Sequence, residues 1–408
     1  THNAANTFTG NSTVSAGTLN LSNSQGFGLG GTVTLAGGEI KAGNPGVDMA
    51  NNLVLSGGGI DTNGEDFTVS GVVSGGSNLA VHGFGILAFA NSANSYTGDT
   101  LVTDGALQAD ADNVFGSGDI VLSDGTTLIA GGASVSFAND VYIAPTTIID
   151  TGVNTMTLDG VVHDNGGAGT ISKSGSGTLV LTNGANDFTG GTSINAGTIN
   201  IDSQTALSTG AIVMQDGTSL GGASASNFDI ANDITINGTS TVGANATRFQ
   251  LDGIIDGSGT LAMSYAGYLV LRGNNTYTGG TDIASGYVDV DHNNALGTGD
   301  LTLGDGAKLG GFSLGITLAN NIILSGTTAV IYASDLTVDG DISGPATLNV
   351  LADGGKLTLT GTNTHAATSI GAAAILVAGA DANLGTGALE FAGNGATLEF
   401  ANATTFTH

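Results

Sequence analysis

The sequence of 408 residues contains no cysteine, no tryptophan and only three prolines. A secreted chain without cysteine has no disulfides, so its fold must rest on a large repetitive core. Only six side chains are Lys or Arg, against 34 that are Asp or Glu, and the net charge is -28. So few cations cannot neutralise a phosphate backbone, which excludes nucleic-acid binding.

Long apolar runs are also missing. No segment is long enough to span a membrane as a helix, and none has the pattern of a signal peptide. The C-terminal stretch lacks the alternating, aromatic-flanked strands of an outer-membrane barrel. If the protein is secreted, we expect its export segments and barrel anchor to lie outside this chain.

Glycine is abundant, with 70 residues, and alternating Val, Ile, Leu and Thr fill the intervals between glycines. This composition is typical of many short strands joined by tight turns, without long helices. The acids are nearly all aspartate, which favours turns, so the negative charge is expected mainly on turns. Its simplest role is solubility and self-repulsion, with a calcium-loaded surface as the alternative.

A repeat of about ninety residues runs through the chain. Its first anchor is an Asn followed, two residues later, by an aromatic residue and Thr-Gly. The aromatic positions are Phe8, Tyr96, Phe188 and Tyr277, and His365 stands in a decayed copy. Two more anchors keep the same register. They begin at Leu29, Phe115, Leu207, Leu296 and Leu384, and at Ala50, Ala138, Ala231 and Ala319.

Short apolar-x-apolar segments lie inside each unit, such as Val33-Thr34-Leu35 and Leu53-Val54-Leu55. Alternate residues of such a strand point to the same face. Because the strands are short and unequal, a winding coil of about 20–25 residues per turn suits them better than hairpins. The sequence predicts one all-β parallel β-solenoid over 1–408 with about four and a half repeats. The units are approximately 1–85, 86–177, 178–267, 268–355 and a partial 356–408.

The residues from Gly177 to Leu181, Asn186 to Thr192 and Ile194 to Ile199 carry a recognisable pattern. It resembles the passenger-associated transport repeat of bacterial autotransporters, and a second copy starts at Tyr268. The resemblance implies a right-handed β-helix passenger carried to the cell surface through a C-terminal barrel anchored in the outer membrane. The last copy departs from the pattern, since His365 replaces the aromatic residue and Ala367 and Ala373 replace glycines.

The serine motifs of protease and esterase passengers that begin with Gly-Asp are absent, since neither Gly-Asp-Ser-Gly nor Gly-Asp-Ser-Leu occurs. The histidines have no zinc-site spacing, and we expect each to be a solvated turn residue. They are His2, His82, His163, His292, His365 and His408. The sequence therefore predicts no catalytic, cofactor-binding or metal site, and no enzyme.

Two carboxylate pairs are the strongest alternatives: Asp110 with Asp112, and Asp289 with Asp291. Glycosidases use such pairs, but strand alternation produces them freely in an aspartate-rich chain. No Arg or Lys lies near either pair in sequence, which disfavours polysaccharide cleavage. The sequence has no EF-hand loop and no Gly-Gly-x-Gly-x-Asp repeat, which disfavours calcium binding at these pairs.

Two classes of function remain. The favoured one is a cell-surface stalk or adhesin, active in aggregation or biofilms, whose partner is another copy or a surface glycan or protein. The alternative is a polysaccharide-binding or polysaccharide-cleaving β-helix, which needs two or three acids and a base on neighbouring turns. A filament or sheath subunit is a third possibility.

Three structural predictions follow from the repeat. Asparagines at coil corners should bond to neighbouring coils; they are Asn51, Asn52, Asn139, Asn232, Asn320 and Asn321. Gly17, Gly105, Gly197 and Gly286 should have positive φ or face a close backbone, while the geometry at Ala373 should be relaxed. The residues expected to face inward are Leu179, Leu181, Ile194, Ile199, Leu269, Leu271 and Ile283.

Overall fold

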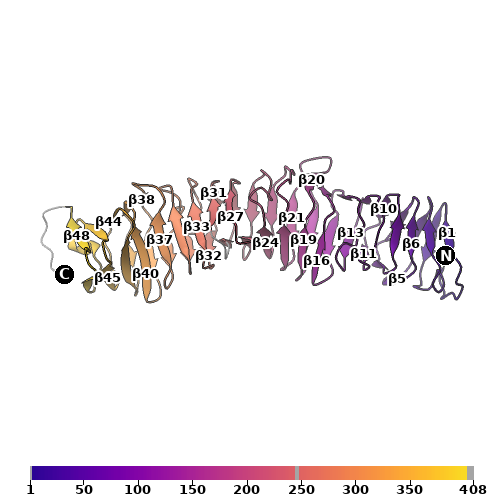
Figure 1. Ribbon diagram of the computed structural model, residues 1–408, viewed down its shortest axis with the longest axis horizontal. Coiled ribbons are helices and arrows are strands. Elements are labelled where there is room, and N and C mark those ends of the chain that lie inside the picture. Colours follow the sequence, from indigo (N-terminus) through magenta and orange to yellow (C-terminus); the bar gives the residue numbers. More distant parts are fainter. Residues whose placement is uncertain (1, 244–247, 402–408) are drawn as a thin grey trace. The chain divides into compact units, whose positions relative to one another are not determined.

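The computed structural model describes residues 2–243 and 248–401, which form two compact units divided after Gly210. Short strands stack side by side in sequence order in each unit (Figure 1). All the strand pairs in the described residues are parallel, as in Ser12↔Val33 and Phe249↔Leu269. The only helical element there is a 3-10 turn, η1 (Asp381–Asn383). The predicted all-β parallel β-solenoid is confirmed.

The strands of the first unit form four stacks, in which each strand pairs with the next. One sheet is β1 (Ser12–Val14), β3 (Val33–Leu35), β6 (Leu53–Leu55) and β9 (Val73–Gly75). A second is β2 (Thr18–Leu21), β4 (Glu39–Ala42), β7 (Gly59–Asp61), β10 (Leu79–His82), β12 (Thr100–Val102), β14 (Ile120–Leu122), β17 (Val141–Ile143) and β20 (Val162–Asp164). A third is β5 (Val47–Met49), β8 (Phe67–Val69), β11 (Ile86–Phe89), β13 (Ala106–Ala109), β15 (Thr127–Ala130), β18 (Ile148–Asp150), β21 (Ile171–Ser174) and β23 (Thr192–Ile194). A fourth is β16 (Ser134–Phe137), β19 (Thr155–Leu158), β22 (Thr178–Leu181) and β24 (Thr198–Ile201).

The second unit is built in the same way. One sheet is β25 (Ile212–Met214), β28 (Ile234–Ile236) and β31 (Ile255–Gly257). Another is β26 (Ser219–Gly222), β29 (Thr239–Gly243), β32 (Thr260–Met263), β34 (Thr281–Ile283), β36 (Leu301–Leu303), β39 (Ile322–Leu324) and β42 (Ile342–Ser343). The longest in this unit is β27 (Asn227–Ile230), β30 (Arg248–Leu251), β33 (Tyr268–Leu271), β35 (Tyr287–Val290), β37 (Lys308–Gly311), β40 (Thr328–Ala333), β43 (Thr347–Ala352), β45 (Ala367–Ile370) and β47 (Leu389–Phe391). The last is β38 (Thr317–Leu318), β41 (Leu336–Val338), β44 (Lys356–Leu359), β46 (Ile375–Ala378) and β48 (Thr397–Phe400).

Each coil advances by about the predicted number of residues. Paired residues are 19 apart in Tyr268↔Tyr287 and 24 apart in Ile149↔Lys173. The core lies inside the coil, where apolar residues at alternate strand positions stack on their equivalents above and below. All seven side chains predicted to face inward are at most 1% exposed: Leu179, Leu181, Ile194, Ile199, Leu269, Leu271 and Ile283.

The asparagine of the first repeat anchor joins three successive coils. Asn275 is 1% exposed; its Oδ1 accepts a hydrogen bond from Ile255 N at 2.8 Å, and its Nδ2 donates to Ala295 O at 2.6 Å. The equivalent residues Asn94, Asn186 and Asn363 make the same two bonds. We call this arrangement the asparagine clamp. Buried backbone groups at the corner need partners, which explains why asparagine recurs there.

The other corner asparagines also bond between coils, as predicted. Asn51, Asn139 and Asn320 donate Nδ2 to glycine carbonyls of the preceding coil, and Asn52 and Asn321 accept backbone N–H groups of the following coil. Asn232 is 6% exposed at the equivalent position.

The aromatic residue after each asparagine clamp enters the core. Tyr96 and Tyr277 are fully buried, and each hydroxyl lies within hydrogen-bond distance of a threonine Oγ1, at 2.7 and 2.5 Å. His365 is equally buried, and its Nε2 lies 2.7 Å from Thr368 Oγ1. The copy that looks decayed in sequence therefore keeps both the burial and the threonine contact.

The repeated glycine has the predicted backbone. The φ angles at Gly17, Gly105, Gly197 and Gly286 are 68°, 74°, 69° and 88°. A Cβ at Gly197 would lie 2.4 Å from Gly177 O, so the neighbouring coil also excludes a side chain there. The expectation of relaxed geometry at Ala373 is wrong, because its φ is 56°. Its turn between β45 and β46 still needs a left-handed residue, and alanine takes that conformation at some cost in strain.

The prediction of one continuous solenoid over 1–408, with unit boundaries near residues 85, 177, 267 and 355, stays a prediction. Among residues 2–243 and 248–401, no helix is long and apolar enough to cross a membrane.

Candidate functional site

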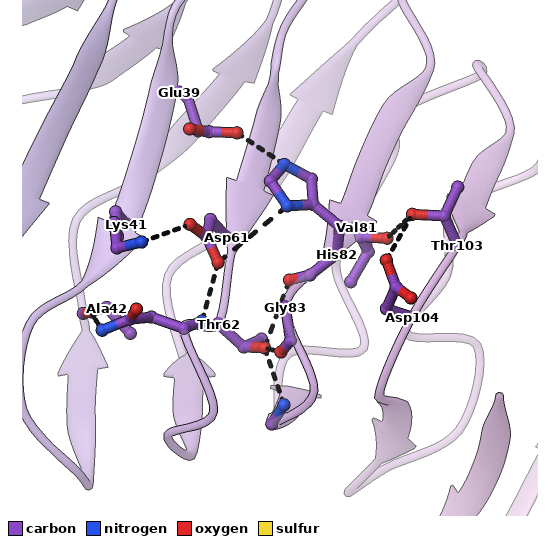
Figure 2. Close-up of polar contacts among 12 residues, drawn as sticks. Glu39, Lys41, Ala42, Asp61, Thr62, Val81, His82, Gly83, Thr103 and Asp104 are labelled. Atoms are coloured by element: carbon purple, nitrogen blue, oxygen red, sulfur yellow. Dashed lines mark hydrogen bonds and ion pairs between the residues drawn. The ribbon is translucent and has the colours of Figure 1, made fainter. Parts of the chain in front are cut away.

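Charged side chains from separate coils meet on the outer face of the sheet that contains β4, β7 and β10. Lys41, Asp61 and His82 occupy one row across these strands. Lys41 Nζ lies 2.8 Å from Asp61 Oδ2, and His82 Nε2 lies 2.5 Å from Glu39 Oε1, 43 residues away in sequence (Figure 2). Gly59 stands between Glu39 and Ala80 in the neighbouring row, so it leaves space for His82 to reach Glu39.

The electrostatics of this cluster hold Asp61 in its charged form. Burial raises the pKa of Asp61, but hydrogen bonds from Lys41 and the Asn63 N–H, and the charges of Lys41 and His82, hold the pKa below its usual value. The side chains are 13–36% exposed, and the acids already have partners. We interpret the cluster as a connection between three coils.

The expectation that every histidine lies on a solvated turn is wrong. His365 is buried, and His82 and His163 lie on strands β10 and β20. His163 stacks on Tyr142 with ring centroids 4.7 Å apart, and its Nδ1 lies 2.8 Å from Asp187 Oδ1. Coil stacking brings together residues that are far apart in sequence, so the sequence around one histidine does not show which side chains it contacts. His408 lies outside the described residues.

A buried lysine is the most unusual charged group in the core. Lys173 is 0% exposed, and its Nζ donates to Ser174 O, Gly175 O and Ala196 O at 2.8, 2.7 and 3.0 Å. Burial lowers the pKa of Lys173 to about 8, and the charge of Asp150 offsets this only in part. Perturbed pKa values often mark functional sites, but this side chain faces the core and contacts only the chain itself, so we assign it a structural role.

The densest outer-face cluster lies on the sheet that contains β30 to β43. The chain has only two arginines, Arg248 and Arg272, and both lie in this cluster. Three of its seven tyrosines lie there too, and their rings form a continuous row. Ring centroids are 5.0 Å apart for Tyr268 and Tyr287, which are stacked, and 5.1 Å apart for Tyr287 and Tyr332, which are tilted. We call this row the tyrosine ledge.

Asp289 lies beneath the tyrosine ledge and is 5% exposed. Tyr268 donates its hydroxyl to Asp289 Oδ2, and the Tyr287 hydroxyl also hydrogen-bonds to this carboxyl. Burial raises the pKa of the Asp289 carboxyl, and the nearby hydroxyls of Tyr268 and Tyr287 offset this only in part. A Cβ at Gly310 would lie 2.2 Å from Asp289 Oδ1 and 2.4 Å from the Tyr287 hydroxyl, so only glycine fits against the pair.

The structure gives the Asp289–Asp291 pair a base that the sequence did not reveal. Arg272 Nε lies 3.0 Å from Asp291 Oδ2, and the guanidinium carbon lies 4.7 Å from the centroid of the Phe312 ring. Arg272 is 17 positions before Asp289 in sequence. The strand register pairs Leu271 with Val290, which places Arg272 on the preceding coil, beside the Asp289–Asp291 pair. The length of a coil is the signal that bears on this contact, but it varies from 19 to 24 residues and so does not single out Arg272.

The other carboxylate pair serves the chain itself. Asp110 Oδ1 accepts a hydrogen bond from Gln108 Nε2 at 2.7 Å, and Asp112 Oδ1 accepts one from Ser136 N at 2.9 Å. A polar groove on the sheet of β32, β34 and β36 is lined by Thr260, Thr281, Asp282 and Thr302 among others. Within residues 2–243 and 248–401, no group of three or more His, Cys, Asp or Glu side chains is arranged to hold a metal ion.

Comparison with known families agrees with this architecture. The family described as "Passenger-associated-transport-repeat" matches residues 3–21, 81–109, 171–201, 256–290 and 351–377. Each segment contains a copy of the first repeat anchor, and the last includes the copy with His365. These matches confirm the resemblance found in the sequence, which is to an autotransporter passenger with β-helical repeats.

Among individual proteins, the chain is similar to the "Adhesin BmaC autotransporter" of Brucella suis biovar 1 (strain 1330). The two are 27% identical over 406 residues, which cover 82% of this chain and 11% of the adhesin. The chain thus spans about a tenth of the length of that relative. No solved structure matches the chain significantly.

Proposed function

We propose that this chain is part of an adhesive stalk that attaches the bacterial surface to other cells or to surface ligands. The observation that carries the proposal is the similarity to a named adhesin over 82% of the chain. The architecture supports it, because the stacked coils of each unit hold many outer-face side chains in fixed positions. The carboxylates at the sequence pairs are engaged by hydrogen bonds or an ion pair, which supports binding more than catalysis.

Self-association is the finer part of the proposal. At a net charge of -28, copies repel each other at low ionic strength. Salt shortens the range of that repulsion to about 10 Å at 0.1 M, and divalent cations can bridge aspartates on two copies. Contact between copies should therefore strengthen with salt or calcium.

The test combines sedimentation of the purified chain across NaCl and CaCl₂ series with settling of cells that display it. Cells that display an unrelated acidic solenoid are the control. We expect clumping or surface attachment that depends on the chain and rises with ionic strength. A chain that stays monomeric in every condition, displayed on cells that neither clump nor attach, would contradict the adhesive function. Turnover of an acidic polysaccharide that is lost in Asp289→Asn would favour a polysaccharide-cleaving enzyme instead.

A further inference from the structure

The outer face around the tyrosine ledge differs from the rest of the chain in the kind of side chain it presents. Many outer-face positions on neighbouring strands hold Thr, Asn or Ser, as in the row Thr155, Thr178 and Thr198. On the β30–β43 sheet the equivalent rows hold Arg248, Tyr268, Tyr287 and Lys308. Both sets of rows lie on strands with the same parallel pairing, so the difference is in the side chains presented to solvent.

We propose that this face is a binding site for neutral saccharides, formed by the tyrosine ledge together with Arg272, Asp291 and Phe312. The inference deepens the proposed adhesive function and rests on it.

Sugar rings need two kinds of contact, and both are present at this face. The C–H face of a pyranose packs on aromatic rings, which offer large, rigid surfaces with little entropy to lose. The half-buried tyrosines provide such a surface, and Phe312 beside them is 43% exposed. The hydroxyls of a sugar need planar hydrogen-bonding groups, and Arg272 and Asp291 stand as a fixed pair at 3.0 Å, next to the Phe312 ring.

The site is held in place before any ligand arrives. Tyr268 is anchored by its hydrogen bond to Asp289, and Gly310 allows Tyr332 to lean over its strand and reach Tyr287 two coils away. Asp289 is a positioning residue that fixes the rings from below. The hydroxyls of Tyr268 and Tyr287 both bond to this carboxyl, so one buried acid holds two rings of the ledge.

Charge favours a neutral sugar over an acidic one. Both arginines are already neutralised: Arg248 pairs with Asp229 at 2.5 Å, and Arg272 pairs with Asp291. Asp353 is a further exposed acid near the ledge, and its charge raises the pKa of Asp289. An anionic saccharide would meet this local negative charge and the net charge of -28 of the whole chain.

The spacing suits a chain of sugars that runs along the coil axis. Tyr268 and Tyr287 lie on adjacent coils, which stack about 4.8 Å apart. Tyr332 leans across one coil, so the three ring centroids are spaced at 5.0 and 5.1 Å. An extended polysaccharide laid across the coils would therefore meet successive rings with successive sugar units. A protein partner would need on the order of 800 Å² of surface, whereas the exposed large apolar side chains beside the ledge are confined to Phe312 and Leu314.

The test is electrophoresis of the purified chain in native gels that contain a soluble polysaccharide. The neutral probes are hydroxyethyl cellulose, xyloglucan and galactomannan, and polygalacturonate is the acidic probe. Because the chain has no tryptophan, tyrosine fluorescence gives a second reading of binding. We expect retardation by at least one neutral probe and none by polygalacturonate.

Three variants locate the binding. Tyr332→Ala and Phe312→Ala should each weaken it about tenfold or more, and Phe312 is exposed enough for its loss to leave folding intact. Tyr142→Ala is the matched control, since Tyr142 is also a half-buried outer-face tyrosine stacked on a ring of the next coil, His163. The control should bind like the unmodified chain.

Several results would overturn the proposal: no retardation by any neutral probe, retardation by polygalacturonate alone, or equal loss of binding in all three variants. If cells displaying the chain still clump while the purified chain ignores every neutral probe, the saccharide site fails and the adhesive stalk stands. If the neutral probes bind but cells neither clump nor attach, the site stands and the adhesive function fails.

Discussion

Replacing Lys173 with methionine should stabilise the protein at neutral pH. The repeat itself suggests the substitution, because Val81, Met263 and Val350 occupy the equivalent inward position in other copies. Lys173 stacks between Ile149 and Ile194, so its aliphatic chain has the same surroundings as a methionine side chain. Only its ammonium group differs, and that group bonds to three turn carbonyls.

The magnitude follows from the pKa of Lys173, which falls from 10.5 to about 8 on folding. At about 1.4 kcal/mol per pKa unit, the charged form costs the folded state about 3 kcal/mol. Between pH 8 and 10.5 the unfolded chain binds the proton and the folded chain does not, so the stability of the unmodified protein rises with pH across that window. Lys173→Met should therefore gain about 1–3 kcal/mol at pH 7, and the gain should vanish near pH 10.5. The freed carbonyls lie on a half-buried turn, where water can reach them.

Urea unfolding followed by circular dichroism at pH 7 and pH 10.5 measures both quantities. Met263→Lys is the matched control, since it places a lysine at the equivalent position of another copy. It should lose stability at pH 7 and recover part of the loss as pH rises. A methionine variant less stable than the unmodified protein at pH 7 would refute this reasoning, as would a difference that does not change with pH. Either result would mean that the three hydrogen bonds outweigh the cost of burying the charge.

Four further changes test other parts of the structure. Gly197→Val should cost about 1–3 kcal/mol in the same urea assay, because φ is 69° and the new Cβ would strike Gly177 O; an unchanged midpoint would contradict it. Asn275→Ala should cost about 2–4 kcal/mol, since it leaves a buried N–H and a buried C=O without partners, whereas Asn274→Ala beside it should have little effect. His365→Phe should cost about 1 kcal/mol through the lost contact with Thr368, and thermal melting would show whether His365→Tyr restores it. Asp289→Asn should stabilise the protein at pH 7 but not at pH 3. The pKa of Asp289 is raised on folding, so ionising this carboxyl above pH 3.8 costs the folded state more than the unfolded state. Equal stabilisation at both pH values would count against this reasoning.

The sequence predicted the fold well because its information is local and repeated. The inward residues of β22 and β33 follow from alternation within a single strand, and the left-handed glycines follow from recurrence at one repeat position. Ala373 and His365 show the limit of that method. Both differ from the repeat pattern, yet both keep the conformation or contact of the residue they replace, since neighbouring coils dictate the geometry more strongly than the residue itself does.

The candidate site was harder to predict because its residues come from different coils. Asp289 and Asp291 were visible as a pair, but Arg272 joins them only through a coil of 19 residues, and other coils have up to 24. With a period this variable, the sequence does not say which side chains share a row. Tyr332 illustrates the difficulty further, because it reaches Tyr287 across a strand whose glycine leaves the way open.

The asparagine clamp has a consequence for how such a chain is assembled. Asn275 is satisfied only when the coil before it supplies an N–H and the coil after it supplies a C=O. The clamps occur once per repeat, so a chain that folds coil by coil from one end reaches such an asparagine at intervals of several coils. At each of these coils the amide is half-satisfied until the next coil arrives, so elongation is favoured over stopping there.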